Sequence, residues 1–338
     1  MAQSENVVLV TGAAGWLGSL VSRALTEDPK TPDVRLILAD VVEPNAPSAN
    51  AIVLKTDLTD PSQVTALFQT AYGVPDTVYC LHGIMSRGSE DNFDLGLQVN
   101  VESIRSVLDA ARHCGAAVGR PIKFIFTSSL AVYGGTLPDV VTPTTIATPE
   151  SAYGTGKLIS ELLINEYTRR GYIDGRILRL PTIVVRPGAP SAATSSFLSG
   201  IIREPLHGKP SVCPIGDSLD SPALELAAWL ASPTTTIRNL VRAKHVPAAA
   251  FLPHTRVVCA PGFTATVREM LAALEAVGGK EALARVNFKD DPVNRRVVSS
   301  WPARFDNTYA LGLGFTGDQG GMRAVVESFA EEVKAGRA

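Results

Sequence analysis

The sequence has few cysteines, no long apolar run and no marked excess of charge of either sign. Its cysteines lie far apart and form no CxxC or Cys/His cluster; they are Cys80, Cys114, Cys213 and Cys259. This spacing predicts reduced thiols in a cytoplasmic protein, and it offers no metal site. The 31 basic and 33 acidic residues give a net charge of −2, which favours neither nucleic acid nor an anionic membrane surface as a partner.

Signals for export or membrane insertion are also lacking. Residues 1–6 have neither the basic segment nor the apolar core of a signal peptide, and no apolar run approaches the length of a membrane span. The chain has 338 residues, of which 45% are hydrophobic and 19% charged. These values are ordinary for a globular intracellular enzyme with about two domains, or with one large domain and an annex.

The stretch from Val7 to Leu25 has the pattern of a strand, a glycine-rich turn and a helix. Four apolar residues predict a buried strand, and apolar residues at helical spacing follow the turn. Gly12 allows a tight turn, Gly15 lets the backbone approach a pyrophosphate, and Gly18 permits close packing of the helix. Free N–H groups at the helix start suit an anion. The pattern therefore indicates a dinucleotide site, although any α/β protein can have a glycine-rich turn.

Asp40 ends the second predicted strand, which covers residues 33–39. A carboxylate at this place can accept both hydroxyls of the adenosine ribose, and it repels a 2′-phosphate. No basic residue follows at positions 41 and 42, so NAD is favoured over NADP. Asp57 and Leu58 follow the third strand, where an adenine ring would lie, although Asp57 is equally suited to a structural turn. Asp60 before Pro61 predicts a helix start.

The fourth predicted strand, residues 77–81, leads into His82 and Gly83. Gly83 lets the backbone run close to a cofactor, whereas His82 is interpreted as a structural histidine and not as a catalytic base. A helix is predicted over residues 92–114. Asn100 lies within this helix, where an asparagine either makes a specific hydrogen bond or faces water.

The residues that can carry chemistry follow the fifth strand, residues 122–127, which ends in Ser128 and Ser129. Tyr153 and Lys157 are four residues apart on a predicted helix, so their side chains share one face. A nearby ammonium is expected to lower the pKa of the phenol from about 10 toward neutral pH, which makes it usable as a general base or acid. A serine at the strand end can hold the same substrate oxygen.

Together, residues 11–18, 57–58, 128–134 and 153–157, with Asp40, resemble the extended short-chain dehydrogenases/reductases of the NAD-dependent epimerase/dehydratase family. The resemblance implies an α/β fold with a doubly wound parallel sheet (Rossmann) and a smaller C-terminal substrate-binding annex. It assigns the acid/base role to Tyr153. Lys157 would bind the nicotinamide ribose and tune the tyrosine, and Ser129 would orient the substrate. Ser128 would then face the cofactor or the sheet.

Several further segments resemble family members that oxidise small sugar acids; they are residues 93–100, 179–188, 195–206, 301–306 and 311–315. Residues 215–228 depart from that pattern. The resemblance implies NAD-dependent oxidation of an aldonate at its 2-hydroxyl to a 2-keto acid. Relatives dimerise through the helices at 92–114 and 152–171, so a homodimer is expected. The alternatives are a nucleotide-sugar epimerase of the same fold and a non-catalytic protein that senses the cofactor.

The carboxylate of such a substrate needs a cation or several donors, since burying it unpaired is costly. The candidates are Ser86, Arg186, Ser195, Ser196 and Arg203, together with Ser129 for the reacting hydroxyl. Arginine suits this task because its planar fork pairs with both carboxylate oxygens. The alternative is that Arg186 and Arg203 only tie loops together through backbone carbonyls. Arg179, inside a strand, is interpreted as a buried and paired structural residue.

The predicted organisation divides the chain into two parts. Residues 1–186 are expected to form the NAD-binding Rossmann domain, and residues 229–262 to return to this domain. Residues 187–228 and 263–338 are expected to form the smaller substrate-binding region. The residues expected to contact NAD are Gly12, Gly15, Trp16, Leu17, Gly18, Asp40, Asp57, Leu58, His82, Gly83, Asn100, Tyr153, Lys157, Pro181 and Ile183.

Overall fold

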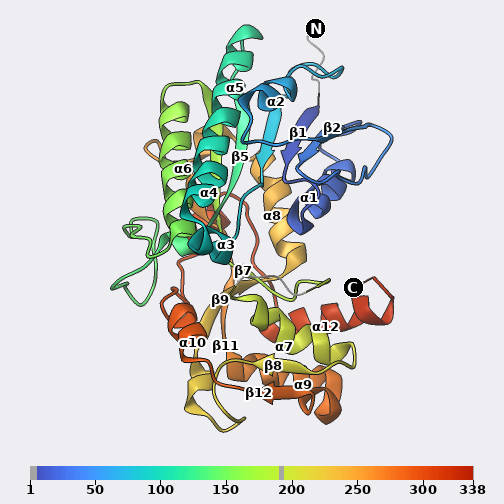
Figure 1. Cartoon of the computed structure of the whole chain (residues 1–338), viewed down its shortest axis with the longest axis vertical. Helices are drawn as coiled ribbons and strands as arrows, with labels where there is room; N and C mark the ends of the chain where they lie inside the picture. Colours follow the sequence, from blue (N-terminus) through green and yellow to red (C-terminus); the bar gives the residue numbers. More distant parts are fainter. Residues whose placement is uncertain (1–5, 190–193, 338) are drawn as a thin grey trace.

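The computed structural model describes residues 6–189 and 194–337, and it divides into an upper part and a lower part in Figure 1. Residues 1–5, on which the expected lack of a signal peptide mainly rests, lie outside the described residues. Within the described ranges, no helix is both long enough and apolar enough to cross a membrane.

The upper part is built on a parallel sheet that has seven strands within the described ranges. They are β1 (Val7–Thr11), β2 (Arg35–Asp40), β3 (Ala51–Lys55), β4 (Thr77–Cys80), β5 (Ile122–Ser129), β6 (Ile173–Leu180) and β10 (Val257–Cys259). Their order across the sheet is β3-β2-β1-β4-β5-β6-β10. The central strands are nearly continuous runs of buried apolar residues, as expected for a sheet covered on both faces. The predicted doubly wound sheet is confirmed.

Helices cover both faces of this sheet (Figure 1). One face carries α1 (Trp16–Thr26), α8 (Pro233–His245) and α11 (Thr308–Gly312). The other face carries α2 (Pro61–Ala66), α5 (Ser103–Ala117) and α6 (Ala152–Arg169). The predicted N-cap of α2 is confirmed, because the side chain of Asp60 accepts a hydrogen bond from the Ser62 amide.

The single helix predicted over residues 92–114 is wrong in detail. The chain forms α3 (Ser86–Asp91), α4 (Phe93–Leu97), one π-helical turn at Gln98–Glu102 and then α5. The π-helical turn inserts one additional residue, which periodicity alone does not reveal, and it contains Asn100. Such turns often occur at functional sites.

The lower part has its own apolar core, which includes Leu198, Ile202, Met270, Leu274 and Val326. Its strands are β7 (Thr182–Ile183), β9 (Ala227–Ala231) and β11 (Phe263–Thr266) in one sheet, and β8 (Ser211–Cys213) and β12 (Val286–Phe288) in another. Its helices are α7 (Ser196–Leu206), α9 (Val267–Leu283), α10 (Pro292–Ser299) and α12 (Gly321–Lys334). Short 3₁₀ turns occur at Leu130–Val132, Pro222–Glu225 and Ala248–Ala250.

The structure differs from the predicted division at two segments. β9, which was expected to return to the Rossmann domain, pairs with β7 and β11 of the smaller sheet. Conversely, α11 and Phe315, placed by sequence in the smaller region, pack into the core beside α1 and α8. Short apolar segments carry no signal for which of two neighbouring cores they join, so only the packing decides these positions.

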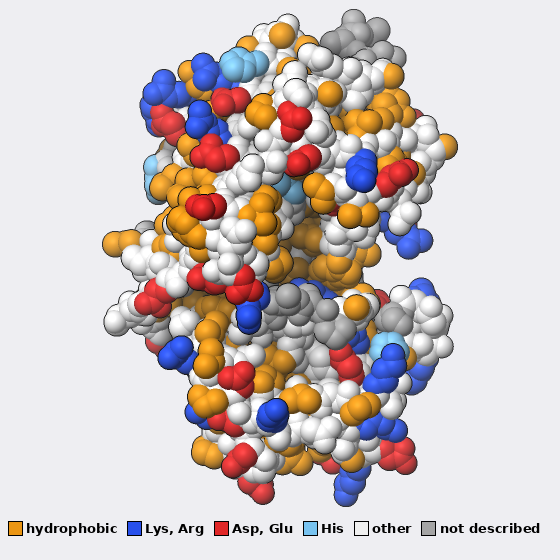
Figure 2. Space-filling model, viewed as in Figure 1, with side chains coloured by type: hydrophobic (Ala, Val, Ile, Leu, Met, Phe, Trp, Pro, Cys, Tyr) orange, Lys and Arg blue, Asp and Glu red, His pale blue; other side chains and the backbone are white. Residues whose placement is uncertain are grey.

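The strand order reverses between β1 and β4. Strands β2 and β3 lie on one side of β1, whereas β4 and β5 lie on the other side. Open α/β sheets bind ligands at such a point, beyond the carboxyl ends of the strands. Figure 2 shows that the surface is hollowed between the two parts of the molecule, and that hydrophobic side chains line the hollow.

Candidate active site

The glycine-rich turn after β1 packs tightly against the chain after β4. Gly12 has a φ of 72°, and a Cβ added to it would lie 2.7 Å from the backbone nitrogen of His82. A Cβ on Gly18 would lie 2.1 Å from the carbonyl oxygen of Gly12. On Gly15 it would meet that oxygen at 3.2 Å, and among the described residues other than its chain neighbours no further contact lies within 4 Å. The tight turn at Gly12 and the close packing at Gly18 are confirmed.

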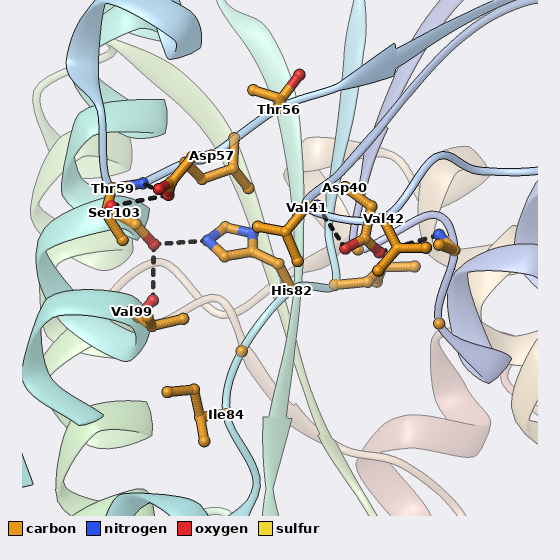
Figure 3. A pocket seen from close by; sticks show the side chains of 16 residues that line it. Asp40, Val41, Val42, Thr56, Asp57, Thr59, His82, Ile84, Val99 and Ser103 are labelled. Carbon is orange, nitrogen blue, oxygen red and sulfur yellow. Dashed lines mark hydrogen bonds between the residues drawn. The ribbon is translucent and has the colours of Figure 1, made fainter. Parts of the chain in front are cut away.

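A cavity of about 520 Å³ opens beside this turn, at the ends of β1, β2, β3 and β4 (Figure 3). The carboxylate of Asp40 lies at its edge and accepts hydrogen bonds from the amides of Ala14 at 3.0 Å and Val41 at 2.7 Å. Asp57 lines the cavity next to Leu58, and one of its oxygens also accepts from the amide and the hydroxyl of Thr59. Asp57 therefore serves the turn and faces the cavity.

His82 is a fully paired structural residue, as interpreted from the sequence. Its Nε2 lies 2.8 Å from the hydroxyl of Ser103, and its Nδ1 lies 2.8 Å from the hydroxyl of Thr11. Ser103 itself donates to the carbonyl of Val99, so it accepts from His82 Nε2–H (Figure 3). Burial lowers the pKa of His82 to about 3, which keeps the ring neutral. The backbone at His82 and Gly83 lines the cavity.

A second cavity, of about 400 Å³, adjoins the first and extends toward the lower part of the molecule. The two share Gly12, Gly15, Leu81, His82 and Gly83, so they form one continuous groove. The candidate residues that line this second cavity are Trp16, Leu17, Gly18, Ser86, Ser129, Tyr153, Lys157, Pro181, Ile183, Arg186 and Ser195. Residues from β5, α6, the β6–β7 connection and the start of α7 are thus brought together.

Tyr153 and Lys157 share one face of α6, as their spacing predicts. The Nζ atom of Lys157 lies 5.6 Å from the ring centre of Tyr153 and 4.6 Å from that of Phe126. It also donates a hydrogen bond of 2.8 Å to the carbonyl oxygen of Thr127. The ammonium is therefore held between α6 and the end of β5, and it faces the cavity that Ser129 also lines.

The expectation of a lowered phenol pKa is wrong for the protein alone. Burial raises the pKa of Tyr153 to about 12, and a hydrogen bond with Ser129 opposes this shift only in part. Burial also lowers the pKa of Lys157 to about 8, although the acidic groups of Cys80 and Glu161 raise it in part. The sequence shows the spacing of the phenol and the ammonium but not their desolvation, which disfavours both charged forms.

Asn100 was expected to contact the cofactor, but it lies behind the cavity walls. It is buried, its Oδ1 accepts from the amide of Ile84 at 2.9 Å, and its Nδ2 donates to the carbonyl of Ile84 at 3.0 Å. It is not among the described residues that line either cavity. Asn100 instead holds the loop after β4 in place, because the π-helical turn points its side chain toward that loop.

The two candidate arginines have different surroundings. Arg203 is buried, and its guanidinium donates to the carbonyl of Arg186 at 2.8 Å and to the carboxylate of Glu204 at 2.6 Å. Arg203 is not among the described residues that line the second cavity, and it ties α7 to the loop at Arg186 through a backbone carbonyl, as the alternative interpretation proposes. Arg186 lines the cavity, and its guanidinium has no hydrogen-bond or ion-pair partner among residues 6–189 and 194–337. Ser196 begins α7 and, unlike Ser195, is not among the described lining residues.

Several lining residues were not anticipated as site residues. They are Leu81, Met85, Thr127, Leu130, Ala131, Leu180 and Trp301. Among the described lining residues, Trp301 alone comes from beyond residue 195. Its contact with the cavity depends on the return of the chain after α10, and a lone tryptophan in a loop gives no local signal of this.

The groove fits a dinucleotide cofactor. It extends from Asp40, past the glycine-rich turn and the start of α1, to Tyr153 and Lys157. The indole N–H of Trp16 is buried without a hydrogen-bond partner among the described residues, and Trp16 lines the groove. Backbone donors at the start of α1 and a carboxylate at the end of β2 are suited to a pyrophosphate and a ribose, respectively.

This fold and this groove define a member of the NAD-dependent epimerase/dehydratase family. The model of that family matches residues 8–221, so the chain belongs to it. The protein is accordingly an NAD-dependent oxidoreductase.

The chain is similar to two proteins named D-erythronate dehydrogenase along almost its whole length. It is 39% identical over 326 residues to D-erythronate dehydrogenase of Haemophilus influenzae, covering 96% of this chain and 98% of that one. It is 41% identical over 319 residues to D-erythronate dehydrogenase of Cupriavidus necator, covering 92% and 94%. Among solved structures, a nucleoside-diphosphate-sugar epimerase from Agrobacterium tumefaciens superposes with a TM-score of 0.89 at 33% identity, over 98% of this chain and 95% of that one.

Proposed function

We propose that this protein oxidises D-erythronate, or a closely similar small aldonate, at its 2-hydroxyl to the 2-keto acid. The observation that carries the proposal is one shared cavity. Ser129, Tyr153 and Lys157 line it together with Arg186, a cation whose guanidinium has no partner among the described residues, next to the nucleotide groove. The similarity to two D-erythronate dehydrogenases supports the choice of substrate.

In the proposed reaction, Tyr153 acts as the general base. Its phenolate takes the proton of the 2-hydroxyl while the hydrogen on C2 leaves with its electron pair, so that a carbonyl forms. NAD, when bound, supplies the acceptor for this hydride. Ser129 donates a hydrogen bond to the substrate oxygen and keeps it next to the phenol. General-base assistance of this kind contributes about 10²–10⁴ in rate. In the reverse direction, the neutral phenol returns the proton.

Other residues would hold the cofactor. Asp40 would accept the hydroxyls of the adenosine ribose, and Asp57 with Leu58 would face the adenine. The turn at Gly12, Gly15, Trp16, Leu17 and Gly18 would take the pyrophosphate, with the backbone at His82 and Gly83 beside it. Lys157 would donate to the nicotinamide ribose, and Pro181 with Ile183 would lie along the nicotinamide. All of these residues line the groove.

Arg186 is proposed to bind the substrate carboxylate. Its backbone is fixed on both sides, because its amide donates to Ser199 at 3.1 Å and its carbonyl accepts from Arg203 at 2.8 Å. Burial and the charge of Arg203 lower the pKa of Arg186, so a bound anion would relieve an unfavourable charge. Ser86 and Ser195 line the same cavity and offer hydroxyl donors for the remaining oxygens of the acid.

The experiment that tests this function follows NADH at 340 nm after D-erythronate and NAD are added to the purified protein. Formation of NADH together with a 2-keto acid supports the proposal. Other aldonates and UDP-sugars are tested in parallel. Conversion of a UDP-sugar to its epimer without accumulation of NADH would assign the epimerase function instead. NAD binding without turnover of any of these compounds would favour the cofactor-sensing alternative.

We further propose that the enzyme is a cytoplasmic homodimer that pairs through the helical segments at 92–114, which contain α4 and most of α5, and at 152–171, which contain α6. The helices α4 and α6 pack together, yet Phe93, Leu95 and Leu162 on them remain 57%, 42% and 62% exposed. The four cysteines are free thiols, in keeping with a reducing compartment. Light scattering at micromolar concentration should give twice the chain mass, and a value near 35.7 kDa would contradict the dimer.

A further inference from the structure

Three side chains on one face of α6 contact three consecutive residues at the end of β5. Lys157 donates to the carbonyl of Thr127 at 2.8 Å, Glu161 accepts from the hydroxyl of Ser128, and Tyr153 is hydrogen-bonded to Ser129. Two of these contacts involve the proposed catalytic groups. The third contact, through Glu161, has no part in the reaction as proposed above.

Glu161 forms a buried ion pair with Arg179 of β6. The guanidinium binds the carboxylate with both prongs, Nε to Oε1 at 2.9 Å and Nη2 to Oε2 at 2.6 Å. Both side chains are almost completely inaccessible to solvent. Removing two charges from water is costly, and apolar side chains of similar volume often stabilise a protein equally well. Stability is therefore a weak explanation for a pair at this place.

The ion pair holds the chain on both sides of Ser129. On one side, its carboxylate accepts from Ser128, the residue before Ser129. On the other side, Arg179 Nη1 donates to the hydroxyl of Tyr133 at 2.6 Å, and the guanidinium carbon lies 4.9 Å from the centre of that ring. Between Ser128 and Tyr133 lie only Ser129 and the 3₁₀ turn that follows it.

Tyr133 is itself fixed by its surroundings. Its ring packs edge to face on the ring of Phe305, with the two ring centres 5.7 Å apart, and its hydroxyl oxygen lies 3.4 Å from the sulfur of Cys259. The segment from Ser129 to Tyr133 is thus attached at both ends to one rigid, doubly hydrogen-bonded unit. Ser129 itself lies at the edge of the substrate cavity, where its hydroxyl accepts from the amide of Ala131 at 3.1 Å.

We propose that the Arg179–Glu161 ion pair is a positioning unit, which sets the catalytic hydroxyl of Ser129 against Tyr153 by holding Ser128 and Tyr133. This inference rests on the proposed function, because it requires Ser129 and Tyr153 to act on the substrate. A hydroxyl that moves away from the phenol is a poorer partner for the reacting oxygen, and small displacements in an active site reduce turnover strongly.

The positioning role has a signature in the pH dependence of turnover. In the free enzyme, before the Ser129 hydroxyl donates to a substrate, its hydrogen bond lowers the pKa of Tyr153. If Ser129 is displaced, this pKa rises, and the pH at which the base becomes active for oxidation moves upward. The other titratable groups around the phenol are Lys157 on the same helix, His82 after β4, and Arg186 across the cavity. None of these three is altered in the variants below.

The test uses two mild variants of the full-length enzyme, Ser128→Ala and Tyr133→Phe, each of which removes one link and keeps the ion pair. Each should lower kcat for aldonate oxidation by about tenfold to a hundredfold. KM for the acid and the Kd for NAD should stay within about twofold of wild type, because the hydroxyl of Ser128 is bound to Glu161 and that of Tyr133 to Arg179, so neither removed hydroxyl is offered to a ligand. The rising limb of the pH profile of kcat/KM, which reports the groups of the free enzyme, should shift to higher pH.

Matched controls remove equivalent bonds elsewhere. Thr236→Val removes a buried hydroxyl bond to the Ser232 carbonyl in α8, and Tyr167→Phe removes a tyrosine bond to Asp109 at the far end of α6. The controls should lower Tm about as much as Ser128→Ala and Tyr133→Phe do, but they should leave kcat and the pH profile unchanged. The inference is overturned if both variants keep the wild-type kcat and pH limb, or if the controls lose as much turnover.

Failure of this inference is separable from failure of the proposed function. Ser129→Ala and Tyr153→Phe are measured in the same assay. If these two retain turnover, the catalytic assignment is wrong. If they abolish turnover while Ser128→Ala and Tyr133→Phe behave as wild type, only the positioning role is refuted.

Discussion

Replacing Arg186 by methionine tests whether this residue binds the carboxylate of the proposed acid substrate. The guanidinium lines the cavity and has no other partner within the described parts of the chain, so its donors are available to a ligand. Hydrogen bonds to charged groups contribute about 1.5–3 kcal/mol each. Two such bonds at the lower end of that range, since the cavity is open to solvent, amount to about 3 kcal/mol. At about 1.4 kcal/mol per tenfold, KM for D-erythronate should rise about a hundredfold.

Arg186→Lys separates charge from geometry. Lysine keeps the positive charge but presents it as a point and cannot hold both carboxylate oxygens in a planar fork. We expect KM to rise about tenfold in this variant, roughly 1.4 kcal/mol. The assay measures initial rates of NADH formation over a range of D-erythronate concentrations at saturating NAD. NAD affinity is measured separately by titration, and it should not change.

The control is Arg323→Met, which removes an exposed arginine of α12 that pairs only with Glu327, at 2.8 Å, among the described residues. Its kinetic constants should match those of the wild type. If neither substitution of Arg186 raises KM by about tenfold, or roughly 1.4 kcal/mol, the carboxylate is held by hydroxyl and backbone donors such as those of Ser86 and Ser195. The reasoning from the unpaired guanidinium would then be wrong.

Three further predictions concern the base and the cofactor. Tyr153→Phe should lower kcat by about 10²–10⁴, since it removes the general base; retention of more than a few per cent of activity, with NAD affinity intact, would exclude this role. Asp40→Ala should narrow the preference for NAD over NADP in kcat/KM, whereas equal use of both cofactors by the wild type would refute the ribose contact. Because burial raises the pKa of Tyr153 to about 12, the phenol is protonated at neutral pH. The kcat/KM for oxidation should therefore increase with pH from 6 to 9, reduction of the 2-keto acid should be favoured at lower pH, and a flat profile in both directions would contradict proton transfer through this group.

Much of the nucleotide groove could be predicted from local sequence. The turn at Gly12 and Gly18 and the carboxylate at Asp40 belong to segments whose conformation depends on near neighbours. A positive φ needs glycine, and a run of buried β-branched residues needs a central strand. Parallel strands then bring their carboxyl ends to one edge of the sheet. The pairing of Tyr153 with Lys157 follows from helix geometry for the same reason.

The substrate side of the site depends on long-range packing. Arg186 and Arg203 appear equivalent in sequence, yet one faces the cavity and the other is buried against a backbone carbonyl. The sequence predicts that Asn100 contacts the cofactor, but the π-helical turn directs its side chain to the loop after β4. Trp301 reaches the cavity only because the chain returns to it after α10.

The sequence by itself thus determined the class of fold, the nucleotide groove and the spacing of the candidate catalytic groups, because these features arise within single strands, turns and helices. The tertiary structure decided which of the two candidate arginines has no partner among the described residues, which side chains line the second cavity, and how far burial raises the pKa of Tyr153. It also joined Glu161 and Arg179, which are 18 residues apart, into one pair behind Ser129. Burial and pairing between distant segments are properties of the packed chain, and no local pattern of residues encodes them.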